Sequence, residues 1–449
     1  MKKLVLVLAI GALLVLSLYL ASQNTHQVPQ APQSPTKCAD CNIIIISFDS
    51  LRADHVGYFG YSKNTTPNID KFCDESTVFK NAVTQGHWTL PSFASIFTST
   101  YPSVHGELKG INNTSLGKKI PKNLVTLPEI LKKNNYTTFG ISSIPYFSSI
   151  YGFDRGFDTF DDSWGFNSFD NVQGELKMVY DFLPNVTDEA VGFIRNNSNK
   201  KFFLLVHYNS PHAPYNNTPL EYIQDIPSNA NITHLLNIAG QEGQLDNETV
   251  VNNLSPEEIA FIRSAYDGKI RYADSEINKI LNEVKNQHLE GKTIIVIMSD
   301  HGENLGEYGY FGHGRETPNN ETAYVPLIVK IPNTEPQTIN RYVQTMDIAP
   351  TLLDAAGIEK PDYYQGRNLF SNDDEVAYQE YINYVVARKS NQEVVYNKET
   401  GEMNSSWDGG IRDFNAKNEA LVKKLNITYD DIIVPQYIID IMKKRGLIR

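Results

Sequence analysis

Three short apolar runs restrict the fold of this chain more than any other feature. They cover residues 42–49, 202–207 and 293–299, and each is rich in Ile, Val, Leu or Phe. A run that is apolar at nearly every position is typical of a strand buried on both faces, as in a parallel sheet. Residues 138–141 and 325–330 form shorter runs of the same kind. We therefore expect all five segments to be strands.

Helical patterns lie between these runs. Residues 256–284 carry apolar side chains at the spacing of one helix face, and residues 124–133 and 347–356 are shorter examples. Strands that alternate with helices predict an α/β fold. We expect a three-layer sandwich around a mostly parallel sheet.

The C-terminal part has a different pattern. Two short β-branched stretches follow residue 384, and a helical pattern covers residues 435–444. We expect a main catalytic domain over residues 41–375 and a small, β-rich C-terminal subdomain over residues 376–449.

The N-terminus predicts export. Lys2 and Lys3 precede an apolar run that ends at residue 21, nearly long enough to cross the ~30 Å hydrocarbon layer. Residues 1–21 are therefore a transmembrane anchor or a signal peptide, and in both cases the rest of the chain lies outside. Residues 22–40, rich in Pro and Gln, form a linker. We expect a single-pass protein of the cell membrane with its catalytic domain outside, or a secreted one.

Sequons and cysteines agree with an extracellular location. Thirteen Asn-x-Ser/Thr sequons run from Asn64 to Asn426 and predict a glycoprotein. Cys38 and Cys41 are expected to form a small disulfide, because disulfides persist in oxidising compartments, and Cys73 is expected in the core.

The charge balance excludes one class of partner. The chain has 52 acidic and 40 basic residues, a formal net charge of −12, and no basic block. Such a charge repels nucleic acid and anionic lipid. We expect no nucleic acid partner, and a membrane contact only through the N-terminal segment.

Acids and imidazoles follow the apolar runs. Asp49 ends the first run, His207 ends the second with His212 shortly after, and Asp300 and His301 follow the third. In open α/β sheets, ligands bind at the carboxyl edge of the strands. The sequence therefore predicts that these side chains share one site.

Thr89 has a helix signal beside it. Pro91 opens an apolar stretch at helical spacing, which marks a helix N-terminus. The free N–H groups at such an end stabilise anions, so a hydroxyl there ionises more easily, above all next to a divalent cation. Alone, this signal is weak, because Thr is also a common N-cap residue.

Several motifs together resemble the sulfatase family, within the alkaline phosphatase superfamily. They occur in the family's order between about residues 42 and 370. The matching segments are Ile-Ser-Phe-Asp-Ser-Leu-Arg-Ala-Asp at 46–54, Thr-Pro-Asn-Ile-Asp at 66–70, Thr-Leu-Pro-Ser at 89–92, Tyr-Pro-Ser-Val-His-Gly at 101–106, His-Tyr-Asn-Ser-Pro-His-Ala-Pro at 207–214, Ser-Asp-His-Gly-Glu at 299–303, His-Gly-Arg at 313–315, Val-Pro-Leu-Ile at 325–328 and Met-Asp-Ile-Ala-Pro-Thr-Leu at 346–352.

The resemblance implies a metal-dependent enzyme. Asp49, Thr89, Asp300 and His301 then bind one divalent metal ion, and Thr89 is also the nucleophile. Carboxylate oxygens with one imidazole suit Ca²⁺, Mn²⁺ or Zn²⁺, among which the pattern does not choose.

The resemblance also implies roles for two histidines. His212 and His313 contact the transferred ester group and its leaving oxygen. His207 is either a further site residue or a buried histidine. Three other residues are expected on the surface or behind the ligands: Glu303, Glu307 and Arg315.

Departures from the sulfatase pattern reduce the range of activities that the resemblance implies. At the position of Thr89, sulfatases carry a Cys or Ser that is oxidised to formylglycine. An Arg is replaced by Phe93, Ser50 stands where a second acid usually follows Asp49, and the Lys after the glycine of the motif near Gly140 is absent. The remaining set is more similar to phosphoglycerol and phosphoethanolamine transferases and to phosphodiesterases, which use threonine.

We therefore expect a hydrolase or transferase that acts on a phosphate ester or diester through a covalent phosphothreonine. His313 or His212 protonates the leaving oxygen, and water or an alcohol then releases the phosphoryl group. An ester on a glycan or a lipid head group is a candidate substrate.

Three alternatives stay open. The chain could hydrolyse sulfate esters as a sulfatase, or it could be an inactive surface protein that binds glycan or lipid. It could also resemble a two-metal phosphatase, which needs a second set of one acid and two histidines.

Overall fold

The structure is a computed structural model, and it describes residues 35–106, 118–164, 169–172, 175–178, 182–226, 230–241, 244–315, 317–373 and 376–428. The expected anchor or signal peptide at 1–21 and the helix expected at 435–444 lie outside these residues. In the described part of the chain, no helix has the length and apolarity of a membrane span.

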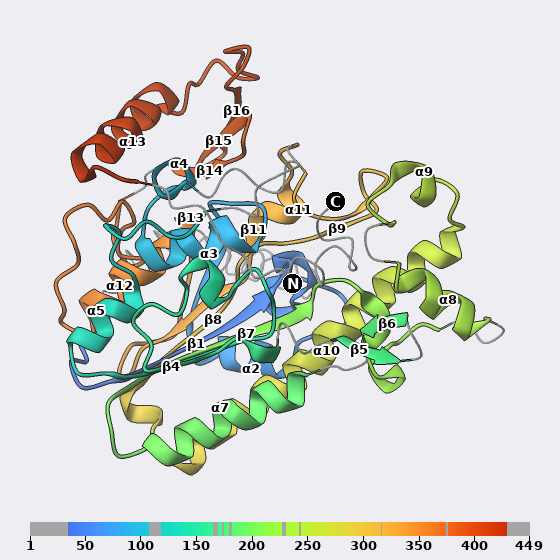
Figure 1. The fold of residues 1–449 in the computed structure, drawn as a ribbon, viewed down its shortest axis with the longest axis horizontal. Coiled ribbons are helices and arrows are strands. Elements are labelled where there is room, and N and C mark those ends of the chain that lie inside the picture. Colours follow the sequence, from blue (N-terminus) through green and yellow to red (C-terminus); the bar gives the residue numbers. More distant parts are fainter. Residues whose placement is uncertain are drawn as a thin grey trace, which may run out of the picture. The chain divides into compact units, whose positions relative to one another are not determined.

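A nine-stranded sheet lies at the centre of the described residues (Figure 1). The strand order is β11-β2-β12-β8-β1-β7-β3-β4, and β13 also pairs with β2. The strands β4, β3, β7, β1 and β8 pair in parallel with one another, whereas β12 is antiparallel to both β8 and β2, and β11 is antiparallel to β2. The prediction of a mostly parallel sheet is confirmed. The strand bounds are β1 Asn42–Asp49, β2 Thr77–Val83, β3 Thr137–Ser142, β4 Thr159–Asp161, β7 Phe202–Pro211, β8 Thr293–Ser299, β11 Tyr324–Val325, β12 Leu327–Lys330 and β13 Gln337–Gln344.

Two details differ from the prediction. The run at 325–330 forms two strands, β11 and β12, with Pro326 between them, because proline cannot donate a ladder hydrogen bond. The strands β2 and β13 were not predicted. Polar side chains such as Lys80 and Arg341 interrupt their apolar pattern, and both strands lie toward one side of the sheet.

Helices cover both faces of the sheet. On β1, Ile44 and Ile46 pack into one hydrophobic cluster, with α7 and α10, and Ile43 and Ile45 pack into the other, with α3, α5 and α12 (Figure 1). Each fully buried side chain of this size contributes about 1.5–3 kcal/mol. The predicted three-layer sandwich is confirmed. The helix bounds are α2 Pro67–Cys73, α3 Thr89–Thr98, α5 Leu127–Lys133, α7 Leu183–Asn197, α10 Pro256–Asn286 and α12 Ile348–Ala355.

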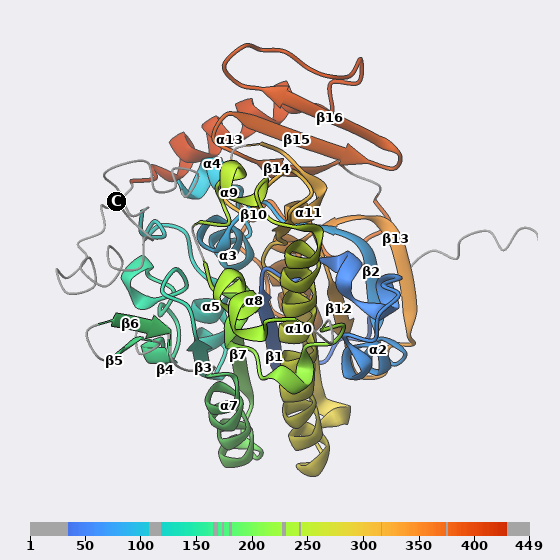
Figure 2. The same ribbon diagram turned by 90° about the vertical axis from the view of Figure 1, so that its right-hand side faces the viewer.

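The C-terminal part is β-rich, as expected. The antiparallel strands β14 (Ala377–Glu380), β15 (Tyr384–Lys389) and β16 (Gln392–Asn397) form a three-stranded sheet, followed by α13 (Ile411–Leu425) (Figure 2). These elements share a small apolar cluster with Tyr101 and Met346 of the main part. The expected Cys38–Cys41 disulfide is present, and Cys73 is buried.

Candidate active site

The carboxyl ends of β1 and β8 bring three ionisable residues together. The two strands are parallel neighbours, and Phe48 lies opposite Ser299. Asp49 ends β1, and Asp300 and His301 follow β8, so all three arrive at the same edge of the sheet. One ligand atom from each of these three buried residues lies within 4.8 Å of the others.

The turns after the two strands hold this arrangement. Ser50 has a left-handed backbone (φ 72°). Its N–H donates to Asp300 Oδ1 at 3.3 Å, and its hydroxyl donates to Asp49 Oδ1 at 3.0 Å. In the other turn, a Cβ on Gly302 would lie 1.9 Å from the carbonyl oxygen of Glu321. Only glycine therefore fits after His301.

The imidazole of His301 faces both carboxylates. Its Nδ1 donates to the carbonyl oxygen of Gly302 at 2.9 Å. Its Nε2 lies 3.3 Å from Asp49 Oδ1 and 3.6 Å from Asp300 Oδ2. A hydrogen bond at one ring nitrogen orients the other toward a ligand, so Nε2 is the atom available to a metal ion.

Thr89 lies beside this group. It is the first residue of α3, as Pro91 predicts, and its hydroxyl oxygen is 3.4 Å from His301 Nε2. Gly86 allows the preceding turn to pack closely, because a Cβ there would lie 2.6 Å from the Pro91 ring. The free N–H groups of this ten-residue helix therefore point toward the Thr89 side of the site.

The three ionisable residues fit a divalent cation. Asp49 Oδ2 and Asp300 Oδ2 are buried and accept no hydrogen bond from the described residues, while the other oxygen of each carboxylate does. Burial raises the pKa of Asp300 to about 7, with His301 opposing the rise and Asp49 adding to it. Two such buried carboxylates 3–4 Å from one imidazole nitrogen need a positive charge between them.

Two more histidines lie next to this group. The backbone N–H of His212, just beyond the end of β7, donates to the carbonyl oxygen of Asp49 at 3.1 Å. The ring of His313 has its centroid 4.2 Å from that of His301 and 4.9 Å from that of His212. The structure thus gathers every residue that the sequence proposes for the site: Asp49, Thr89, His212, Asp300, His301 and His313.

Glu303 is more closely involved than the sequence indicates. It is fully buried, and its Oε1 lies 3.1 Å from His313 Nδ1. Its Oε2 has no hydrogen-bond partner among the described residues. Burial lowers the pKa of His313. The nearby His301 lowers this pKa further, whereas Glu303 opposes both effects. The carboxylate therefore orients the ring of His313.

His207 is a buried histidine that packs against Phe93. The prediction that His207 ends its strand is wrong. The strand β7 continues to Pro211, so His207 lies inside it. Its ring packs on Phe93, with centroids 4.6 Å apart, and burial lowers its pKa to about 4. Phe93 also stacks on Phe147 at 4.1 Å. An aromatic ring thus occupies the position where the family pattern has a guanidinium.

The sequence gives no indication of the place of His87. This residue precedes α3, is buried, and stacks on Tyr381 of the C-terminal part with centroids 4.6 Å apart. Burial lowers its pKa to about 3, and the nearby His313 and His301 lower it further. Its only sequence signal is its position two residues before Thr89.

A second metal set does not form among the described residues. Only Asp49, Asp300 and His301 place three ligand atoms of acids, histidines or cysteines within 4.8 Å of one another there. The geometry therefore favours a one-metal site.

Comparison with known proteins decides the family. The family model described as Sulfatase matches residues 41–358. This chain belongs to the sulfatase family. An ulvan-active sulfatase of Formosa agariphila is 27% identical over 380 residues, which cover 80% of this chain and 69% of that protein. The iduronate 2-sulfatase of Homo sapiens is 27% identical over 338 residues, 65% of this chain and 60% of that protein.

Solved structures share the fold. A protein in complex with its substrate D-glucosamine-2-N,6-O-disulfate aligns with a TM-score of 0.64 and 20% identity, over 86% of this chain and 97% of that one. A phosphonate monoester hydrolase from Silicibacter pomeroyi aligns with a TM-score of 0.60 and 16% identity, over 86% and 95%. This sulfatase-family chain thus has the fold of the alkaline phosphatase superfamily, and it is an enzyme that hydrolyses sulfuric or phosphoric esters.

Proposed function

We propose that this sulfatase-family enzyme acts on a phosphate ester or diester, with Thr89 as the nucleophile. The observation that carries the proposal is the position of the Thr89 hydroxyl at the N-terminus of α3, 3.4 Å from His301 Nε2. A threonine is not the precursor of formylglycine in the family pattern, so its own hydroxyl is the group available for attack.

Asp49, Asp300, His301 and Thr89 would hold one divalent ion. A bound ion supplies a positive charge that favours the ionised hydroxyl and the charge on the transferred group. The oxygen-rich set of Asp49 and Asp300 suits Ca²⁺ or Mn²⁺, and the imidazole also suits Zn²⁺.

The reaction would be a double displacement. The Thr89 oxygen attacks phosphorus, and the bond to the leaving oxygen breaks. His313, oriented by Glu303, or His212 protonates that oxygen, since an imidazolium with a lowered pKa gives up its proton readily. Water or an acceptor alcohol then releases the phosphoryl group, and the acceptor decides between hydrolase and transferase.

A second candidate is the hydrolysis of sulfate esters. Family membership and the sulfatase names of the relatives favour it. Phe93 and Ser50 favour the phosphate proposal, because they replace the Arg and the second acid that accompany formylglycine in the family pattern.

Turnover of matched p-nitrophenyl phosphate, phosphodiester and sulfate substrates by Thr89 variants tests the proposal. Thr89→Ala should lower turnover by several powers of ten, as loss of a covalent nucleophile does. Thr89→Ser should retain part of the activity because the hydroxyl stays. Ser92 is the matched control, since its buried hydroxyl accepts a hydrogen bond from Thr84 at 2.9 Å. Loss of activity in Ser92→Ala with full activity in Thr89→Ala would refute the assignment of Thr89 as the nucleophile. Faster turnover of the sulfate ester than of the phosphate esters would refute the proposed substrate class.

A further inference from the structure

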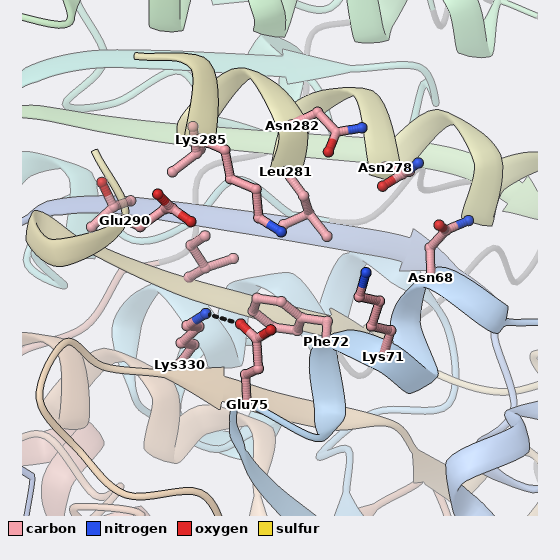
Figure 3. Close-up of a pocket in the computed structure, with 13 residues that line it drawn as sticks. Asn68, Lys71, Phe72, Glu75, Asn278, Leu281, Asn282, Lys285, Glu290 and Lys330 are labelled. Atoms are coloured by element: carbon pink, nitrogen blue, oxygen red, sulfur yellow. Dashed lines mark hydrogen bonds and ion pairs between the residues drawn. The ribbon is translucent and has the colours of Figure 1, made fainter. Parts of the chain in front are cut away.

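A polar cavity lies at the opposite end of β8 from the candidate active site. It has a volume of about 240 Å³ and opens between α2, the C-terminal part of α10 and the start of β8 (Figure 3). This amino-end cavity includes Thr293, the first residue of β8, whereas Asp300 follows the last. Seven strand residues at ~3.3 Å each separate the two sites by roughly 20 Å. The cavity is therefore not part of the catalytic machinery.

Three lysines converge on the amino-end cavity. Lys71 comes from α2, Lys285 from α10 and Lys330 from the end of β12, and Figure 3 shows Lys71 and Lys285 reaching into the space between the two helices. Lys330 pairs with Glu75 at 2.6 Å. The hydrogen bond from Lys330 lowers the pKa of Glu75, and Lys285 and Lys71 lower it further. All three ammonium groups thus act on one small volume.

Two of these lysines form no direct ion pair in the part of the chain that the structure describes. Within the described residues, neither Lys71 nor Lys285 forms an ion pair or a side-chain hydrogen bond. Two carboxylates, Glu75 and Glu290, also line the cavity. The three ammonium groups outnumber them, so the cavity keeps a net positive charge that favours an anion.

The wall formed by α10 adds neutral hydrogen-bonding groups. Asn278 and Asn282 lie one turn apart on the face that lines the cavity, and Lys285 continues that face. Amide groups both donate and accept hydrogen bonds, which suits an oxyanion or the hydroxyl groups of a sugar next to it.

We propose that the amino-end cavity binds an oxyanion, a sulfate or phosphate group, through Lys71, Lys285 and Lys330. The group is either a free ion or a substituent of a sugar, since both present the same tetrahedral oxygens. Glu75 competes with this ligand for Lys330. The site is independent of the Thr89 chemistry, so its failure and that of the proposed function are separate results.

Equilibrium dialysis of the full-length, metal-loaded protein with radiolabelled inorganic sulfate, and then with phosphate, tests the proposal. The wild type should bind at a site that the double variant Lys71→Met/Lys285→Met weakens by about tenfold or more, the effect of losing charge-assisted hydrogen bonds. Lys279→Met is the matched control, because Lys279 lies on the same helix, pairs with Glu276 at 2.8 Å and does not line the cavity. Ester turnover and the melting temperature should stay unchanged in all of these variants.

The direction in which a Glu75 variant changes the affinity for sulfate gives a second test. Glu75→Gln frees Lys330 and should tighten binding of sulfate. Equal binding by the wild type and the double lysine variant, or weaker binding by Glu75→Gln, would overturn the proposal. A sulfated monosaccharide distinguishes the sources: if it binds more tightly than inorganic sulfate and Asn278→Ala/Asn282→Ala removes the difference, the group is carried on a sugar. Equal affinities identify the free ion.

Discussion

The two ends of β8 carry opposite chemistry. At the carboxyl end, Asp300 and His301 are fully buried and lie next to Asp49, so acids and imidazoles gather in a buried site. At the amino end, the exposed Lys71 and Lys285 and the partly buried Lys330 line a polar cavity (Figure 3). One strand thus connects a site rich in buried carboxylates with a cavity in which ammonium groups outnumber carboxylates.

Burial explains why the two ends of β8 differ in the strength of their charge interactions. Buried carboxylates interact strongly at low dielectric, so they select a metal ion and hold it rigidly. Exposed ammonium groups are screened by water and salt, so they attract anions weakly and reversibly. We therefore expect large effects from variants at the carboxyl end and small ones at the amino end.

Of the variants that compare the two ends of β8, Asp300→Asn should lower turnover the most. Loss of the metal site should lower turnover by about three powers of ten, since a Lewis acid supplies several kcal/mol of transition-state stabilisation. In chelator-treated protein the same change should raise the melting temperature, because it removes a buried charge beside Asp49. Steady-state kinetics checks the fall in turnover, and calorimetry checks the rise in melting temperature. An active Asp300→Asn variant would show that this end does not hold the catalytic metal.

Glu303→Gln should give an intermediate effect. The amide keeps the size of the side chain but weakens the contact with His313 Nδ1, and loss of such an orienting partner typically costs 10–100-fold. We expect kcat to fall and KM to change little. Glu75→Gln at the amino end is the matched control and should leave kcat unchanged. A fall in both variants would point to a general effect on the fold.

The smallest predicted effect is a dependence of metal stabilisation on pH. In the metal-free protein, the pKa of Asp300 is raised from 3.8 to about 7 and that of His301 from 6.5 to about 9. Both groups bind more protons in the folded state, so stability falls as the pH rises through these ranges. A metal ion replaces those protons. The rise in melting temperature on adding Mn²⁺ or Ca²⁺ should therefore be larger at about pH 8 than at about pH 5.5. An equal rise at both values would contradict the assignment.

Much of the carboxyl-end site is predictable from the sequence. The runs that form β1 and β8 are apolar at nearly every position, and the carboxyl ends of parallel strands meet at one edge. The meeting of Asp49, Asp300 and His301 follows from these two facts. Pro91 predicts the helix start that places Thr89 beside them.

The amino-end cavity and the supports of the site are not predictable in this way. Lys71, Lys285 and Lys330 come from three distant segments, and no periodic pattern links them. The stacking of His87 on Tyr381 likewise depends on where the C-terminal sheet packs. Long-range packing decides such contacts, and local sequence patterns do not record it.

Rapid acid quenching of the enzyme during turnover of a phosphate ester, followed by mass spectrometry of the peptide that contains Thr89, shows whether Thr89 is the nucleophile. We expect a phosphoryl group on Thr89 in the wild type and none in Thr89→Ala. A phosphoryl group on Ser92, or an enzyme that turns over phosphate esters and never carries a label, would contradict the account.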